Sequence, residues 1–458
     1  MKRRTFLFSP AATLAARSLA GAGSPQSDIL GAALSDQQGW RRLEHLCYHI
    51  GPRLGGSKAL SQAVEWAAQL LRDDGQENVQ LQPVKVPHWV RGEERCVEVL
   101  PAGRELRILG LGGSVGTPSG GVEADLVAVS DFDELERLPR SAVEGRIVLY
   151  NAPFVSYGET VTYRSSGASR AAKLGAVAAL VRSVTPYSLS TPHTGTLYYA
   201  AGEPQIPAVA VTVESAERLA ALYRDGVRVR IHLDMGARTL PDADSFNVLG
   251  EIRGRELPDE IVVFGGHIDS WDVGQGAHDD GAACVAALQA LRLIRRLGLR
   301  PRRTLRLALW TNEENGSRGA RTYSEALGDN VTRHVAAIEM DDGCERPSGF
   351  GLTLAGSDDA ATIRALAQAR QIAASLDGIE AGEITPGGGG GTDIAPLMRA
   401  GIPGFTLRTE GDRYLEWHHT DADTLDKVAP HNFRRAVAAL GVFCYGLAEM
   451  PHRLGAER

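Results

Sequence analysis

The chain has 458 residues, which exceeds the size of one ordinary domain and predicts two. Its composition is globular, with 43% hydrophobic and 23% charged residues, and its net charge of −7 disfavours nucleic acid or an anionic membrane as a partner. The five cysteines are widely spaced and form no CxxC motif, which argues against a disulfide framework and favours buried free thiols.

The first 22 residues resemble an export signal. They have a basic start, a mildly apolar middle and a small-residue end, "AGA", that suits a signal peptidase. The pair Arg3 and Arg4 in "RRTFL" resembles a twin-arginine signal, although Arg17 interrupts the apolar middle and a basic tail is the alternative. We therefore expect a protein exported to the periplasm or the outside. No later segment has the roughly 20 apolar residues of an integral membrane helix.

The next region begins with a helical pattern, in which "AVEWAAQLLRDDG" places its apolar residues on one face. The alternating "VQLQPVKVPHW" then predicts a strand. Near Gly113 the chain becomes rich in Gly, Ser and Pro, and it continues with strand and helix patterns but without a cluster of metal-ligand residues. We interpret residues 113–235 as an inserted domain between two parts of a catalytic domain, 23–112 and 236–450, followed by a tail, 451–458.

The second part alternates regularly between strands and helices. The strand candidates are "FNVLGEIRG", "EIVVFGGHID", "TLRLALWTNEE", "HVAAIEMDD" and "GIPGFTLRT". Helices are expected at about 281–297, 317–327, 359–373 and 431–450. Such alternation predicts an α/β fold with a mostly parallel sheet flanked by helices, and ligands bind such sheets at the carboxyl ends of the strands.

Chemistry-bearing residues gather at the ends of four of these strands. One such ending is ordinary, but four at the same edge of a sheet predict a pocket of oxygen and nitrogen ligands, which suits zinc or a similar divalent ion. The residues are His267 and Asp269; Glu313 and Glu314; Asp341 and Asp342; and His418 and His419.

The spacing within these motifs suggests a division of roles. His267 and Asp269 point to the same side of a strand, so Asp269 can support the imidazole or shape the site. Asp279 opens a helix and is placed to bridge two ions. Glu313 and Glu314 are adjacent and diverge, so that one can bind metal while the other reaches the attacking water. In "GGGGGTD" the glycines indicate either a flexible loop or a close approach that lets Asp393 frame the site.

The motifs "GGHIDSWDVGQGAHDDGAA", "LWTNEENGSRGA", "IEMDDG" and "HHTDADT" resemble the di-zinc aminopeptidases of peptidase family M28, most closely its carboxypeptidase Q branch. "HWVRGEE", "TPHTG" and "DSFN" extend the likeness over most of the chain. The resemblance implies a zinc aminopeptidase-like fold with an inserted protease-associated domain, two Zn²⁺ per chain and a homodimer.

The resemblance also assigns individual residues. It implies that Glu313 is the general base acting on a metal-bound water, with Asp269 as a second catalytic residue. It implies that His419 rather than His418, and Asp341 rather than Asp342, bind metal. The implied ligands are His267, Asp279, Glu314, Asp341 and His419. His278, beside Asp279, either tunes the site or is exposed.

The sequence therefore predicts an exported zinc-dependent exopeptidase that cleaves dipeptides or the first residue of short peptides. Three alternatives remain open. One is a single-zinc transferase that cyclises N-terminal glutamine; another is an amidohydrolase acting on acyl-amino acids. The third is a non-catalytic, receptor-like homologue, which should have lost ligands that this chain retains. Zinc, cobalt and manganese accept similar ligands, so the ligand set alone does not select the metal.

Overall fold

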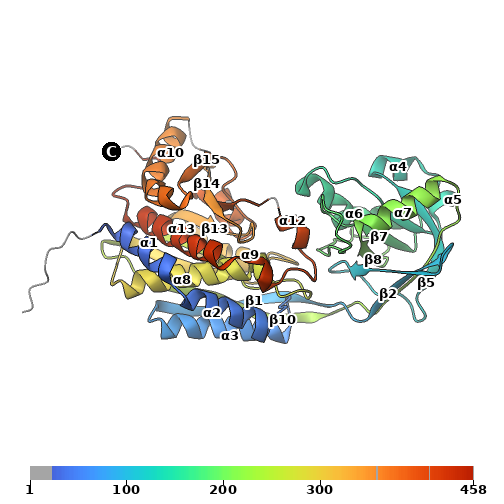
Figure 1. Cartoon of the computed structure of the whole chain (residues 1–458), viewed down its shortest axis with the longest axis horizontal. Coiled ribbons are helices and arrows are strands. Elements are labelled where there is room, and N and C mark those ends of the chain that lie inside the picture. Colours follow the sequence, from blue (N-terminus) through green and yellow to red (C-terminus); the bar gives the residue numbers. More distant parts are fainter. Residues whose placement is uncertain (1–22, 357–358, 412, 457–458) are drawn as a thin grey trace, which may run out of the picture.

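The computed structural model describes residues 23–356, 359–411 and 413–456. The expected export signal, residues 1–22, lies outside them. Within the described ranges, no helix is both long and apolar enough to cross a membrane. The chain forms two bodies, and strands near its first quarter and its middle run between them (Figure 1).

The larger body is built on a mixed eight-stranded sheet, and the four strands at its centre are parallel to one another. In spatial order the strands are β1 (Glu77–Val90), β10 (Arg238–Ile252), β12 (Arg303–Trp310), β11 (Leu257–His267), β13 (His334–Glu339), β16 (Gly404–Thr409), β14 (Pro347–Thr353) and β15 (Glu383–Pro386). The apolar half of β11 is fully buried because helices cover both faces of the sheet. The predicted α/β fold is confirmed, with antiparallel strands added toward the edges.

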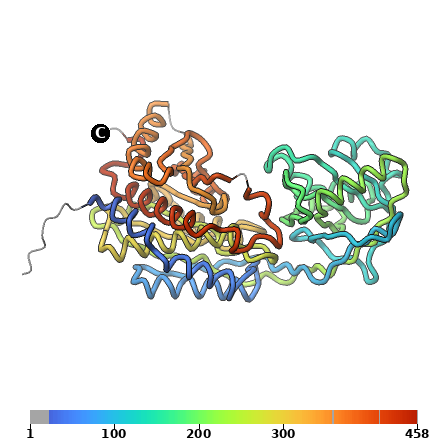
Figure 2. Tube along the Cα trace, viewed as in Figure 1, coloured from blue at the N-terminus to red at the C-terminus, as the bar shows by residue number. Residues whose placement is uncertain are grey.

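Helices pack on both faces of this sheet. In chain order they are α1 (Pro25–Ser35), α2 (Gln38–His45), α3 (Lys58–Asp73), α8 (Ala282–Arg296), α9 (Arg318–Leu327), α10 (Asp359–Ala373), α11 (Ala395–Arg399), α12 (Tyr414–Trp417) and α13 (Pro430–Glu449). Figure 2 shows the first helix, in blue, beside the last, in red. The alanine-rich α8 and α13 are buried along most of their length and lie in the largest hydrophobic core.

The smaller body contains a second eight-stranded sheet. Its order is β3 (Arg104–Leu106), β2 (Glu94–Leu100), β9 (Arg230–Met235), β5 (Val122–Val129), β6 (Ile147–Tyr150), β7 (Ala178–Arg182), β8 (Ala208–Val211) and β4 (Ile108–Gly110). It carries α4 (Phe132–Arg137), α5 (Arg140–Val143), α6 (Tyr157–Lys173) and α7 (Val213–Arg224). Residues 94–110 pair within this sheet, so it begins earlier than the expected boundary at Gly113.

We call this second body the inserted domain, residues 94–235, and the remainder the catalytic domain. The chain leaves the catalytic sheet at the end of β1 and re-enters it at the start of β10, which pair with each other along their length. Trp271 of the catalytic domain packs into a core of the inserted domain, where a Cβ on Gly112 would lie 2.1 Å from its ring. Position 112 therefore requires glycine. The contact with Trp271 places the inserted domain next to the carboxyl edge of the catalytic sheet.

Candidate metal centre

The fold brings five polar side chains together at the carboxyl edge of the catalytic sheet. His267 ends β11, Glu314 follows β12, and Asp341 follows β13. Asp279 lies in a helical turn, Ala277–Gly281, that leads into the buried α8, and His419 follows α12. Because parallel strands share one edge, segments far apart in the sequence meet at one place. All five residues proposed as ligands from the sequence therefore lie in one cluster.

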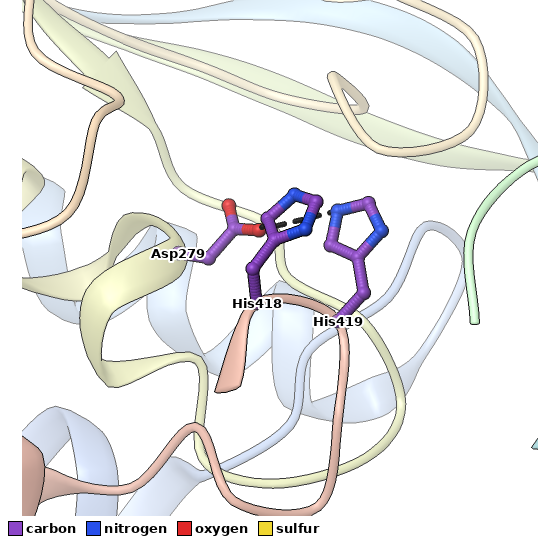
Figure 3. Close-up of side chains that lie close together, drawn as sticks. All are labelled: Asp279, His418 and His419. Carbon is purple, nitrogen blue, oxygen red and sulfur yellow. Dashed lines mark ion pairs between the residues drawn. The ribbon is translucent and has the colours of Figure 1, made fainter. Parts of the chain in front are cut away.

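Asp279 stands between two groups of side chains. Its Oδ1 lies 3.1 Å from Nε2 of His267, and its Oδ2 lies 3.2 Å from Nε2 of His419. Figure 3 shows Asp279 facing the two neighbouring histidines, with His418 Nε2 at 3.6 Å from Oδ2. The two carboxylate oxygens therefore face different donor sets, as a bridging ligand requires.

The first group lies within the catalytic domain. Nε2 of His267 is 3.3 Å from Oδ1 of Asp341. Nδ1 of His267 lies 3.1 Å from the main-chain oxygen of Asp269, which can only accept, so Nδ1 carries the proton. Nε2 is therefore the ring nitrogen that faces the carboxylates, and it would bind a metal once it has lost its own proton.

The second group lies next to the inserted domain. Nε2 of His419 is 3.1 Å from Oε2 of Glu314. The ring of His418 stacks on that of His419 with centroids 3.6 Å apart, and Asp279, His418 and His419 offer donor atoms close enough to hold one ion. The geometry thus keeps His418 within reach of the cluster, whereas the sequence motif favours His419 alone. Glu314 completes the group on the other side of His419.

The electrostatics of the cluster favour a cation. Burial and the charge of Asp279 raise the pKa of Glu314 to about 8. Burial opposes protonation of His267, but Asp341 and Asp279 outweigh it and raise the pKa of His267 well above its usual value. Several carboxylates this close and this buried are costly unless positive charge is added. The mixed carboxylate and imidazole set fits zinc.

Glu313 is placed differently from Glu314. It lines the open cavity above the cluster and is partly exposed, whereas Glu314 is buried with its Oε2 3.1 Å from Nε2 of His419. Burial raises its pKa. The carboxylate of the fully buried Asp269 accepts the main-chain N–H groups of Glu313 and Glu314 at 3.0 and 3.3 Å. Asp269 therefore fixes the backbone from which both glutamates project.

Other buried residues that the sequence did not assign also shape the cluster. Both carboxylate oxygens of Asp423 accept N–H groups of the turn 277–279, which holds Asp279 in place. Arg53, fully buried, donates to main-chain oxygens of Ile268, Gln275 and Gly276. Asp423 lies within a quoted motif, but no signal in the sequence marks Arg53.

Two residues whose place the sequence left open are buried. His278 is 0% exposed, and its Nδ1 accepts the N–H of Cys344, so the exposed alternative is wrong. Asp393 is also buried, beside Glu339, whose Oε2 accepts the N–H groups of Asp393 and Ile394. Asp342, by contrast, is exposed and lies outside both ligand groups.

The cluster opens into a cavity of about 760 Å³ between the two domains. The catalytic domain lines it with Glu313, Ser317 and Tyr414, among others. From the inserted domain, residues of α6 and the loop near Thr196 complete the wall. A cavity of this size fits a small ligand rather than a folded protein.

Taken together, an α/β sheet with a carboxylate and imidazole cluster at its carboxyl edge, a partly exposed glutamate and a cavity above defines a metal-dependent hydrolase. Residues 247–443 match the model of the family described as Peptidase family M28. Carboxypeptidase Q of Mus musculus is 43% identical over 415 residues, 91% of this chain and 86% of that protein. The chain belongs to peptidase family M28 and is a metallo-exopeptidase.

Solved structures agree on the fold. A Peptidase M28 precursor from Shewanella amazonensis has a TM-score of 0.87 and 32% identity, covering 94% of this chain and 97% of that one. A zinc aminopeptidase from Bacillus subtilis has a TM-score of 0.68 and 20% identity, covering 91% and 96%. The likeness to the first spans both domains, so the arrangement of two bodies is common to the two proteins.

Proposed function

We propose that the protein is an exported di-zinc exopeptidase that cleaves dipeptides and short peptides with a free amino end. The observation that carries this proposal is the position of Asp279, whose two oxygens face separate ligand sets. His267 and Asp341 would hold one zinc ion, and Glu314 and His419 the other. When bound, the ions would supply Lewis acidity that favours ionisation of water and stabilises negative charge on the carbonyl oxygen.

The chain's own residues provide the proton transfers. Glu313 lies at the cavity wall beside the cluster and is partly exposed, which suits a general base that takes the proton of the attacking water. The same carboxyl group then delivers a proton to the leaving amine. Asp269 acts as a positioning residue, because its carboxylate holds the main-chain N–H groups of both glutamates.

The cavity wall supports a preference for short peptides. Arg164 of α6 lines the cavity, is 6% exposed, and donates to the main-chain oxygen of Thr194 and the hydroxyl of Tyr157. Its Nε has no partner, and the described residues give it no ion pair. A buried guanidinium without a counter-ion favours a ligand that brings a negative charge, such as the carboxylate of a dipeptide.

The inserted domain, which we assign as the expected protease-associated domain, limits access to this cavity. A dipeptide library tests the proposal on zinc-loaded protein, with the products identified by mass spectrometry. We expect release of the N-terminal amino acid, about two zinc ions per chain, and faster turnover of dipeptides than of their C-terminal amides. Cyclisation of N-terminal glutamine with a single zinc ion, or cleavage of acyl-amino acids alone, would instead support one of the alternative activities.

A further inference from the structure

A short segment of the inserted domain reaches the cluster from the side opposite to the catalytic sheet. This segment, residues 193–196, which we call the docking segment, follows β7 and belongs to the motif "TPHTGT". Thr194 N–H donates to the main-chain oxygen of His419 at 3.0 Å, and the hydroxyl of Thr196 donates to the main-chain oxygen of Glu314 at 2.6 Å. Both partners are proposed zinc ligands on the same side of Asp279.

The docking segment also sets the tautomer of His419. Nδ1 of His419 lies 3.2 Å from the main-chain oxygen of Thr194 and 3.4 Å from Nη1 of Arg164. Arg164 itself donates to the Thr194 oxygen at 3.1 Å, and that carbonyl has two lone pairs. The consistent arrangement is that Arg164 and His419 Nδ1–H both donate to Thr194. Nε2 of His419, the other ring nitrogen, faces Asp279 and Glu314 and would be the atom that binds the zinc ion.

His193 extends the same contact to the neighbouring residue. It is 2% exposed, and burial lowers its pKa to about 3, so the ring is neutral. Its Nδ1 lies 2.8 Å from the main-chain oxygen of His418, which accepts the single ring N–H. A further bond runs from the hydroxyl of Thr185 to the main-chain oxygen of Leu415 in α12. The loop that carries His418 and His419 is thus held at several points by the inserted domain.

We propose that the docking segment is a positioning element of the metal centre, through which the inserted domain completes the zinc site formed by Glu314 and His419. This inference rests on the proposed two-zinc function. It assigns the inserted domain a role beyond covering the cavity, because the orientation of one zinc-binding half depends on its contacts. The other half, His267 and Asp341, has its supporting acceptor within the catalytic domain.

The test removes one hydroxyl from the docking segment. Thr196→Val keeps the shape of the side chain but loses the bond to Glu314, whereas Thr196→Ser keeps the hydroxyl. Thr117→Val serves as a matched control, because the Thr117 hydroxyl bonds only within the inserted domain, to Asp234 and Met235. Zinc affinity of the metal-free proteins is measured by competition with a chelator, and Co²⁺ absorption spectra report ligand geometry at the filled sites.

We expect Thr196→Val to weaken one of two zinc sites by roughly 10–100-fold, which is typical for loss of a supporting contact to a ligand. The other site should keep its affinity, the Co²⁺ spectrum should change, and Thr196→Ser and Thr117→Val should resemble the wild type. His193→Leu, compared with His193→Asn, which keeps a donor at the Nδ1 position, gives a second pair. Wild-type affinities in both Thr196→Val and His193→Leu would overturn the proposal.

Different results would contradict the two-zinc function and the positioning role of the docking segment. A wild-type protein that binds a single zinc ion would contradict the two-zinc function. The positioning role can still be tested at that single site. The role predicts that zinc binds more weakly to Thr196→Val than to the wild type, but not to Thr196→Ser. Equal binding in all variants would overturn the positioning role even if the wild type binds two ions and cleaves dipeptides.

Discussion

The two histidines that flank Asp279 both place Nδ1 against a main-chain oxygen, but the two oxygens belong to different parts of the molecule. The acceptor for Nδ1 of His267 is the main-chain oxygen of Asp269, two residues further along the same loop. For His419 the acceptor is Thr194, which is 225 residues away in the sequence and belongs to the inserted domain. One half of the centre is therefore local, and the other is assembled between two domains.

The two domains therefore provide different supporting contacts: the catalytic domain supports His267, and the inserted domain supports His419. The segment His267–Asp269 contains both Nδ1 of His267 and the main-chain oxygen that accepts from it. The His267 half of the cluster, with Asp341, therefore needs only the catalytic domain. The His419 loop leaves the sheet after β16 and contacts the inserted domain through Thr185, His193 and Thr194. We infer that changes in the inserted domain act first on the His419 half.

The largest expected effect comes from Glu313, the proposed general base. Glu313→Gln keeps the size of the side chain but removes the base, so kcat should fall by roughly 10²–10⁴-fold if it acts as a general base. Zinc content should remain that of the wild type, because Glu313 lies at the cavity wall and is not one of the proposed ligands. Steady-state kinetics and elemental analysis check this pair of outcomes. Near-normal turnover with zinc bound would mean that another group accepts the proton.

The next effect distinguishes the two halves directly. Glu314→Ala removes a carboxylate from the His419 half and should lower the zinc content from about two toward one per chain, with partial recovery of activity in excess zinc. Asp341→Ala is the matched change in the His267 half. Elemental analysis, together with Co²⁺ spectra, should show loss of different sites in the two variants. If Glu314→Ala retains both ions while Glu313→Gln loses one, the roles of the neighbouring glutamates are reversed.

A smaller effect is expected from Asp269, whose main-chain oxygen and carboxylate have separate tasks. Asp269→Asn keeps the main-chain acceptor of His267, but an amide has only one oxygen to accept the N–H groups of Glu313 and Glu314. We expect kcat to fall by about 10–100-fold, as for other supporting residues, with the zinc site at His267 intact. Selective loss of the His267 site, measured by chelator competition, would show that the carboxylate acts mainly on the histidine.

Local patterns in the sequence were sufficient to predict most elements of the catalytic sheet. The strands β11, β12 and β13 and the helix α8 follow the predicted segments closely, because apolar runs and glycine or proline boundaries are local signals. The second sheet also contains residues 94–110, which precede the change in composition near Gly113. Strand β2 joins the second sheet by pairing with β9, more than a hundred residues further on, and such pairing leaves no mark in the local pattern.

The same distinction applies to the site. The proposed ligands at strand ends are recognisable in the sequence, since acids and histidines after an apolar run are rare and the ends of parallel strands converge. The supporting contacts are not recognisable: Thr194 acts through its main-chain oxygen, and the carboxylate of Asp423 binds main-chain N–H groups. Every residue type has a main-chain oxygen that can accept a hydrogen bond. The supporting contacts can therefore be identified only from the packing of the two domains.

The smallest effect concerns the pH dependence of stability at the docking segment. Burial lowers the pKa of His193 to about 3, against about 6.5 in an unfolded chain. The unfolded state therefore binds a proton below about pH 6.5 that the folded state does not take up until about pH 3. The contribution of neutral His193 is present above the unfolded pKa. It is lost as the pH falls through this window, by at most about 1.4 kcal/mol per pH unit.

His193→Asn should flatten this dependence, because asparagine keeps a donor toward the oxygen of His418 but does not titrate. Urea denaturation of wild type and variant between pH 5 and pH 7 measures the slope of unfolding free energy. The matched control is His334→Asn: burial lowers the pKa of His334 to about 4, but its ring bonds to Tyr323 and Val331 within the catalytic domain. Both asparagine variants should lose slope, and neither should alter the zinc site at His419, which only His193→Leu should weaken. An unchanged slope in His193→Asn would show that His193 takes up a proton in the folded protein at the same pH as in the unfolded chain. The docking segment would then be more exposed to solvent than the contacts of His193 indicate.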